Sequence, residues 1–251
     1  SRGHTGWIWL AEHDGGGGAL ELMNPELSNK QGQNWQAGTV NAPTPGATNT
    51  AYTADGAPMI MNVRHDPPIP TSSDEVTISA ELKDEISYGL SALLFYRVST
   101  LNPGSFISLS MDNNAGDTST AVLPAHPDGT VMEFYLAAGD GMNTRTWPGP
   151  TDAGGTQGAN ALYQVDDEVY TGSQPIYRIV MSVPEDNEFL RENFNTRSDA
   201  LMNHTFIARH GTDVDVRYRS GNRVRGAGSR NRNPINLRVN LPRDKPWNGV
   251  S

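Results

Sequence analysis

Short apolar stretches separated by turn-forming residues run through most of this chain. Glu75–Leu82 alternates polar and apolar residues, which is the pattern of a half-buried strand. Comparable stretches recur with turn signals about every 8–15 positions, at residues 58–63, 93–98, 106–111, 121–124, 131–138 and 143–147. Glycine and proline supply 26 and 17 of the 251 residues, which favours turns over long helices. The chain is therefore predicted to be mostly β, built from tandem small β-sandwich modules.

Turn-rich segments divide the sequence into four parts. Residues 1–52 form a small β module and linker, in which Gly15–Gly18 connects two apolar runs as a hairpin. Residues 57–150 form a β-sandwich, and the Gly/Pro-rich residues 151–174 form a linker. Residues 175–251 form a different, α+β unit. Because the chain begins at Ser1 without methionine, we expect it to be an excised piece of a longer protein.

The last part is predicted to hold one helix among several strands. Ser182 is a suitable N-cap, Pro184 lies in the first turn and acidic residues follow, so a helix is expected over 184–194. Ser220-Gly221 is expected to be the turn of a hairpin. The predicted strands cover residues 176–181, 201–208, 214–219, 222–225 and 235–241.

Charge is distributed unevenly along the chain. Residues 197–251 carry 11 Lys/Arg against 4 Asp, a net charge of +7, whereas residues 1–196 carry 8 Lys/Arg against 24 Asp/Glu, a net charge of −16. The two parts should attract each other, or the basic end should attract an acidic partner. The alternative is that the arginines form a solvated face of a sheet.

Several classes of function are not favoured. The chain has no cysteine, which excludes disulfides, thiolate metal sites and cysteine nucleophiles. No apolar run reaches about 18 residues, so no membrane span is expected. Nucleic-acid binding is disfavoured because the arginines alternate along strands with few aromatic residues between them. His204 and His210 lack the spacing of metal ligands, and the tryptophans Trp7, Trp9 and Trp35 suit core packing better than a sugar platform.

One loop of the sandwich offers oxygen ligands for calcium. Asp112, Asn114 and Asp117 lie close together in sequence, and carboxylate and amide oxygens are the ligands that Ca²⁺ prefers. The spacing does not match an EF-hand. The same residue types also suit any tight turn, so both interpretations stay open.

A loop rich in arginine and glycine near the end of the chain is a candidate anion site. Arg225, Gly226, Ser229 and Arg230 precede a strand that contains Arg238. Backbone N–H groups and guanidinium groups in such a loop can bind an anion. Glycines at these positions can equally serve a tight turn.

Three stretches resemble modules of large bacterial surface proteins. Leu20 to Pro25, with the later Asn34-Trp35, resembles the end of a lamin-tail domain, and residues 57–150 are similar to a fibronectin type III or immunoglobulin-like domain. In the last part, Tyr177–Met181, the Arg223–Arg230 loop and the strand around Arg238 resemble the opening of the CotH kinase family. This resemblance implies the start of a kinase N-lobe-like unit.

The CotH resemblance implies ATP-dependent phosphorylation of protein Ser/Thr with magnesium. It places Arg225, Gly226, Ser229, Arg230 and Arg238 near the nucleotide phosphates, and puts the acidic metal-binding positions beyond Ser251. Where many family members have a Lys-Lys pair, this chain has Pro234 and Ile235.

The leading hypothesis is a non-catalytic segment of a secreted or cell-surface modular protein. We expect it to act in structure, adhesion or assembly, through protein partners or self-assembly at sheet edges. The alternative is a fragment of a CotH-type kinase whose catalytic half lies beyond residue 251.

Overall fold

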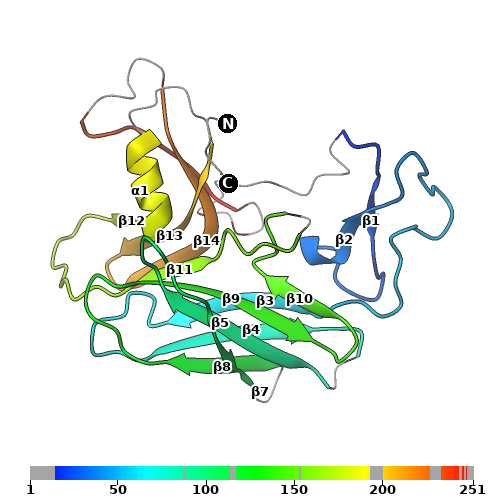
Figure 1. Cartoon of the computed structure of the whole chain (residues 1–251), viewed down its shortest axis with the longest axis horizontal. Coiled ribbons are helices and arrows are strands. Elements are labelled where there is room, and N and C mark those ends of the chain that lie inside the picture. Colours follow the sequence, from blue (N-terminus) through cyan, green and yellow to red (C-terminus); the bar gives the residue numbers. More distant parts are fainter. Residues whose placement is uncertain are drawn as a thin grey trace.

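Antiparallel β-sheets make up most of the regular secondary structure, which confirms the predicted mostly β fold. The computed structural model describes residues 15–86, 89–113, 117–152, 154–192, 200–226, 233–242, 245 and 247. Figure 1 shows a sandwich, a small N-terminal unit at one side of it, and a C-terminal sheet that carries α1. Within the described residues no helix is long and apolar enough to cross a membrane.

Two sheets form the sandwich of residues 59–147. One has the order β3-β4-β8-β7, with β3 (Met59–Asp66), β4 (Val76–Lys83), β8 (Thr118–Leu123) and β7 (Asp112–Asn113). The other has the order β10-β9-β5-β6, with β10 (Thr144–Trp147), β9 (Val131–Gly139), β5 (Ser91–Val98) and β6 (Ile107–Ser110). Alternate residues such as Ile78, Leu94 and Phe134 fill the core between the sheets.

The segment expected to be a linker, residues 151–174, contributes to the core. Ala161–Gln164 form β11, which pairs with β9 just beyond the stretch of β9 that pairs with β10. Ala161, Leu162 and Tyr163 are completely buried. The glycines and prolines on either side shape the surrounding loops, and the buried apolar residues between them form a strand.

The N-terminal unit is attached to the open edge of β3. Its strands β1 (Leu20–Leu22) and β2 (Trp35–Ala37) pair on either side of the 3-10 helix η1 (Gly32–Asn34). The Gln33 amide donates to the Ile60 carbonyl at 2.7 Å and accepts from the Ile60 N–H at 2.9 Å. One side chain thus pairs with both backbone groups of Ile60, as a neighbouring strand would do at this position. Residues Trp7–Leu10, which belong to the predicted N-terminal hairpin, lie outside the described residues.

The C-terminal sheet has the order β12-β13-β14-β15. Its strands are β12 (Ile176–Val180), β13 (Met202–His210), β14 (Asp213–Val224) and β15 (Leu237–Asn240). The helix α1 (Val183–Glu192) follows β12, and the Glu185 N–H donates to Ser182 Oγ at 3.3 Å. The predicted helix with its Ser182 cap is therefore present. It packs Phe189 against Met202 and Val224.

The prediction of a hairpin turn at Ser220-Gly221 is wrong, because β14 runs without interruption through these residues. The chain turns earlier, at Gly211 (φ 63°), between β13 and β14. Gly221 is closely packed, since an added Cβ would lie 3.1 Å from the Leu201 side chain. Between the pairs Phe206–Arg217 and His204–Ser220, β14 contains one extra residue. Tyr218 and Arg219 therefore form a bulge, and Arg219 adopts a positive φ of 55°.

Tyr218 inserts from this bulge into the core of the sandwich. Its ring lies edge-to-face against Phe134 and Trp147, and it is only 7% exposed. Its hydroxyl accepts from the His65 N–H at 3.0 Å and donates to His65 Nδ1, while His65 Nε2 donates to the Pro68 carbonyl at 3.1 Å. Burial lowers the pKa of His65 to about 4, so the ring is neutral at pH 7. The sandwich and the C-terminal sheet therefore share one core.

A buried polar network completes this junction. The Val183 N–H donates to Ser99 Oγ at 2.8 Å, and the Asn203 N–H donates to Glu185 at 3.1 Å. The Asn203 side-chain amide donates to the Asn160 backbone carbonyl at 2.8 Å. Burial raises the pKa of Glu185 to about 8, the nearby Glu133 adds to this effect and the Asn203 hydrogen bond opposes it. At neutral pH the folded protein thus holds Glu185 in its uncharged form.

Candidate binding cleft

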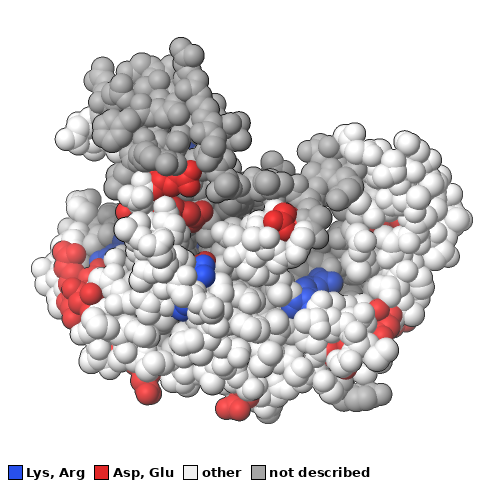
Figure 2. All heavy atoms as spheres, viewed as in Figure 1, with Lys and Arg blue, Asp and Glu red and all other residues white. Residues whose placement is uncertain are grey.

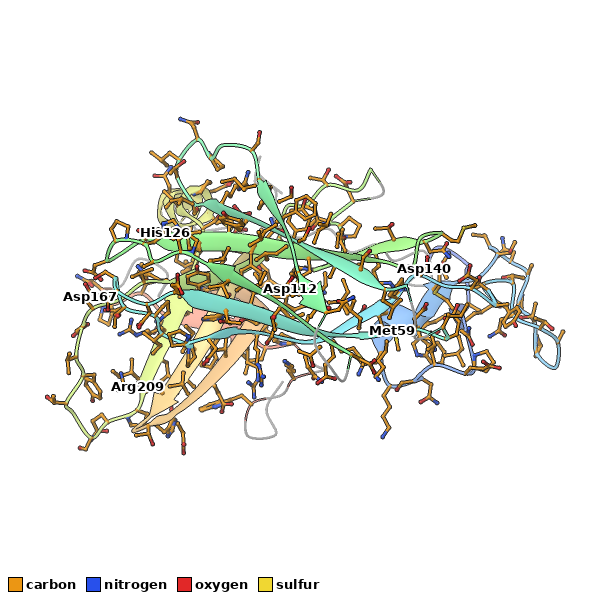
Figure 3. All side chains as sticks on the ribbon, turned by 90° about the horizontal axis from the view of Figure 1, so that it is seen from below. Met59, Asp112, His126, Asp140, Asp167 and Arg209 are labelled. Carbon is orange, nitrogen blue, oxygen red and sulfur yellow. The ribbon has the colours of Figure 1, made fainter. Side chains whose placement is uncertain are left out.

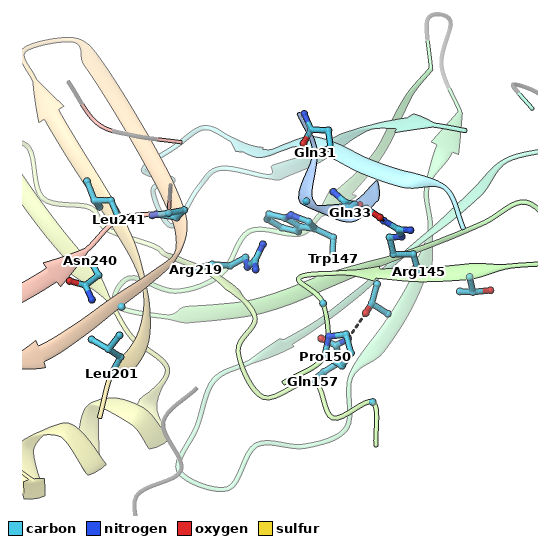
Figure 4. A pocket seen from close by; sticks show the side chains of 17 residues that line it. Gln31, Gln33, Arg145, Trp147, Pro150, Gln157, Leu201, Arg219, Asn240 and Leu241 are labelled. Atoms are coloured by element: carbon cyan, nitrogen blue, oxygen red, sulfur yellow. Dashed lines mark hydrogen bonds between the residues drawn. The ribbon is translucent and has the colours of Figure 1, made fainter. Parts of the chain in front are cut away.

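A cleft of about 1070 Å³ lies where the sandwich, the N-terminal unit and the C-terminal sheet meet. Figure 4 shows Trp147 near its middle, with Arg219 on one side and Gln33 and Arg145 on the other. In the space-filling view, basic atoms lie in the hollow between the sandwich and the N-terminal unit (Figure 2). None of the described residues that line the cleft is Asp or Glu. The cleft is therefore cationic, with an aromatic ring at its centre.

The floor of the cleft is formed by β10 and the loop after it. The Arg145 guanidinium donates to the Gln33 carbonyl, which connects the floor to η1. Burial lowers the pKa of Arg145, and the Asp84 carboxylate opposes this effect. Gln157 donates to Thr146 Oγ1 at 2.6 Å, which fixes the loop against the strand. The floor is therefore held by hydrogen bonds before any ligand binds.

The roof of the cleft is one face of the β14–β15 pair. Gly221 lies opposite Asn240, and both line the cleft. Side chains two residues apart on a strand share a face, and directly opposite residues of paired strands do so as well. Arg223, which is opposite Arg238, therefore shares the sheet face of Gly221 and Asn240, and Arg225 follows two residues later, but none of these arginines is among the residues that line the cleft. We call Arg223, Arg225 and Arg238 the arginine roof.

The predicted anion site lies in this roof. The Arg225 N–H donates to the Asn236 carbonyl at 2.8 Å, and Arg238 Nε donates to Asn240 Oδ1 at 3.0 Å. Gly226 follows directly with a positive φ of 99°. Arg225, Gly226 and Arg238 are thus brought to one end of one sheet. Ser229 and Arg230 lie outside the described residues, and nucleotide binding by this loop stays a prediction.

The predicted calcium loop lies elsewhere, on the sandwich. Figure 3 shows Asp112 on β7, whereas Arg209 lies on the C-terminal sheet. The Asp117 carboxylate forms an ion pair with Lys83, and Asp117 has the positive φ of a turn residue. Asn114 is outside the described residues. In the part of the chain that the structure describes, no three His, Asp or Glu residues are grouped to bind a metal, and calcium binding stays a prediction.

The cleft residues were not singled out by the sequence. Arg145, Trp147 and Gln33 come from segments that read as an ordinary strand and a loop, and they meet only through the docking of η1 on the sandwich. Arg219 could have been suspected from the charge of the C-terminal part. The bulge that directs it into the cleft has no local signal other than the neighbouring glycine.

Comparison with known proteins identifies no family for this chain. No protein-family model matches it, and no curated protein is significantly similar to it. Among solved structures, it is similar to a Paenibacillus sp. cycloisomaltooligosaccharide glucanotransferase complexed with cycloisomaltoheptaose, at 18% identity over 45% of this chain and 14% of that chain, with a TM-score of 0.27. An uncharacterised protein of Listeria monocytogenes has 10% identity over 64% of this chain and 13% of that one, with a TM-score of 0.30. The chain thus spans about one seventh of these proteins, and no property is transferred from them.

Proposed function

We propose that this chain is a non-catalytic segment of a larger secreted or cell-surface protein, with a structural, adhesive or assembly role. Its β units are joined by buried contacts, such as the Tyr218–His65 hydrogen bonds, which suit a load-bearing segment. The observation that carries the proposal is the outer edge of β6, which is unpaired among the described residues and ends the sheet order β10-β9-β5-β6. An unpaired edge strand presents N–H and C=O groups to another chain.

The side chains of β6 favour pairing with another strand and do not shield the edge from it. Ile107 is 57% exposed and Leu109 37% exposed, and the other two residues of the strand are serines. Natural edge strands are usually shielded by lysine, proline or a bulge, and these four residues contain neither of those residue types. Burial of both apolar side chains would contribute on the order of 1–3 kcal/mol each.

A second copy of the chain fits this edge. Two β6 strands can pair antiparallel about a two-fold axis perpendicular to the sheet, with Ser108 opposite Ser108. This register places Ile107 of one copy against Leu109 of the other on the same face. The sheet then continues from one copy into the next, and the exposed apolar pair is buried.

Analytical ultracentrifugation of the chain over a range of concentrations tests the assembly. We expect a concentration-dependent dimer, which Ile107→Lys converts to a monomer by placing a buried charge in the interface. Val122→Lys is the matched control, because Val122 is 50% exposed on β8, which belongs to the other sheet of the sandwich and not to the β6 edge. A strictly monomeric wild-type chain, also by electron microscopy at low salt, would refute the assembly role.

The second candidate is a fragment of a CotH-type atypical kinase, and the arginine roof favours it. Three guanidinium groups on one sheet face are suited to phosphate oxygens. Calorimetric titration of the full-length polypeptide with ATP and magnesium is the test. If ATP binds and Arg225→Ala or Arg238→Ala abolishes binding, the kinase candidate replaces the non-catalytic one.

A further inference from the structure

We propose that the cleft around Trp147 is a binding site for a neutral oligosaccharide. None of its lining residues belongs to the β6 edge, so this site is independent of the assembly proposed above and goes beyond it. The kind of polar side chain in the cleft, the hydrogen-bonding groups that these side chains leave unused and the position of the indole ring support the proposal in turn.

Amide and hydroxyl groups supply most of the polar side chains in the cleft. The amides belong to Gln31, Gln33, Gln157 and Asn240, and the hydroxyls to Thr144 and Thr146. Both arginines among the described lining residues already interact within the chain. The Arg145 guanidinium donates to the Gln33 carbonyl and is attracted by the Asp84 carboxylate. Arg219 has partners as well. The groups left for a ligand are therefore mainly neutral donors and acceptors, which match hydroxyl groups because a hydroxyl can donate and accept.

Some of these neutral groups are not used within the described part of the protein. Gln157 Nε2 donates to Thr146 Oγ1 at 2.6 Å, whereas Gln157 Oε1 is buried and has no hydrogen-bond partner. Asn240 Oδ1 accepts from Arg238 Nε at 3.0 Å, and no described residue accepts from the Asn240 NH₂ group. A buried acceptor without a donor is unfavourable, so a ligand hydroxyl that donates to Gln157 would stabilise the complex.

The indole ring of Trp147 provides an apolar surface among these polar groups. Figure 4 shows the ring near the middle of the cleft, between Arg219 and Gln33. It contacts Tyr218 edge-to-face, with the ring centroids 5.7 Å apart, so the core holds it in place before a ligand binds. A pyranose ring carries C–H groups on its faces and hydroxyl groups around its rim. One face can pack on the indole while the hydroxyls reach the amides on either side.

A saccharide suits this cleft better than an extended peptide. A peptide would add to a sheet edge through main-chain hydrogen bonds, but the segment after β15 that lines the cleft includes Pro242, which has no N–H group. The lining groups are instead side chains from three places: Gln31 beside η1, Gln157 in the loop after β10 and Asn240 at the end of β15. Side chains that converge from several elements can each bind a different hydroxyl of one ligand.

The test is titration of the chain with cellohexaose, maltohexaose, laminarihexaose and N-acetylchitohexaose, with calorimetry and tryptophan fluorescence as readouts. We expect at least one of these neutral hexasaccharides to bind, with an affinity that does not change as salt is raised, because salt screens only charge interactions. Gln157→Leu should weaken binding by about fivefold, which corresponds to one hydrogen bond worth about 1 kcal/mol. Asn240→Ala should weaken it by a similar factor. Asn187→Ala, at an exposed position of α1 outside the cleft, is the matched control and should have no effect.

Three results would overturn the proposal. Failure of all these hexasaccharides to bind at about 1 mM would exclude a neutral oligosaccharide as the ligand. Tighter binding of oligogalacturonate, or of a peptide of alternating Gln and Ser, would assign the cleft to an anionic saccharide or to a peptide. Unchanged affinity in Gln157→Leu and in Asn240→Ala, which changes a partly exposed residue at the end of β15, would place the site elsewhere. Ile107→Lys should retain saccharide binding, so failure of the β6 interface and failure of this site can be distinguished.

Discussion

Replacement of Tyr218 by phenylalanine would remove one hydroxyl group from the junction of the sandwich and the C-terminal sheet. The ring contacts with Phe134 and Trp147, at centroid distances of 5.8 and 5.7 Å, would be retained. The backbone N–H and Nδ1 of His65 would both lose their partner, and His65 is only 3% exposed. Since an unsatisfied buried polar group costs about 1–3 kcal/mol, we expect a loss of about 2–4 kcal/mol in the free energy of unfolding.

Urea unfolding followed by circular dichroism and by differential scanning calorimetry measures this change. Tyr177→Phe is the matched control, because Tyr177 is 50% exposed on the same sheet and stacks on Phe206. Its expected effect lies within about 0.5 kcal/mol, as for most surface substitutions. Both modules should lose stability together in Tyr218→Phe, because the hydroxyl belongs to a shared core.

Two results would refute this reasoning. A loss below about 0.5 kcal/mol would mean that the two His65 groups find other partners or do not need them. A calorimetric transition that splits into two, with the sandwich unchanged, would mean that the sheet does not share its core. The double variant with His65→Phe provides a further check, since removal of both partners should cost less than the sum of the two single changes.

Two pH dependences follow from buried titratable groups. Glu185 has a pKa raised to about 8 in the folded protein, so as pH rises the unfolded chain loses this proton first. Stability should therefore fall as pH rises from about 4.5 to 8. Glu185→Gln should remove this fall and raise the free energy of unfolding at pH 8 by on the order of 3 kcal/mol. A Glu185→Gln variant with an unchanged pH profile of urea midpoints would contradict this cause. His65 and His204 have pKa values lowered to about 4 by burial, so the unfolded chain gains their protons first and stability should fall as pH drops from about 6.5 to 4. Equilibrium unfolding across this interval should show the decrease, and a flat profile would mean that these rings are already protonated in the fold.

The strands of the sandwich could be predicted because the pattern of buried and exposed side chains is visible within each short stretch of sequence. Glu75–Leu82 was expected and Val76–Lys83 was found, since a strand with one buried face alternates polar and apolar residues. The Ser182 cap likewise depends on a few adjacent residues. β11 could not be found in this way, because it is short, buried on both sides and flanked by glycines. Its strand character comes from pairing with β9, which no local pattern encodes.

The cleft depends on contacts between residues that are distant in sequence. Tyr218 and His65 are separated by 153 positions, and Gln33 reaches Arg145 across 112 positions. Each of these residues is ordinary in its own segment. The charge asymmetry of the sequence predicts that the C-terminal part attracts acidic groups. It does not indicate which arginines would do so, because their positions depend on how the C-terminal sheet packs on the sandwich.

The bulge at Tyr218 and Arg219 connects the stability of the fold to the chemistry of the cleft. Because β14 has one residue more than β13 at this point, Tyr218 enters the sandwich core, and the following residues resume the ladder with Gly221 on the cleft face and Val224 facing α1. Without the extra residue, every side chain after it would change faces. Val224 would then turn toward the cleft, and the arginine at position 223 would be driven against Phe189 and Met202. A burial of that kind without a counter-charge is strongly unfavourable. The sequence can therefore keep Gly221 on the cleft face and Val224 against α1 only by keeping the irregularity that also attaches the sheet to the sandwich.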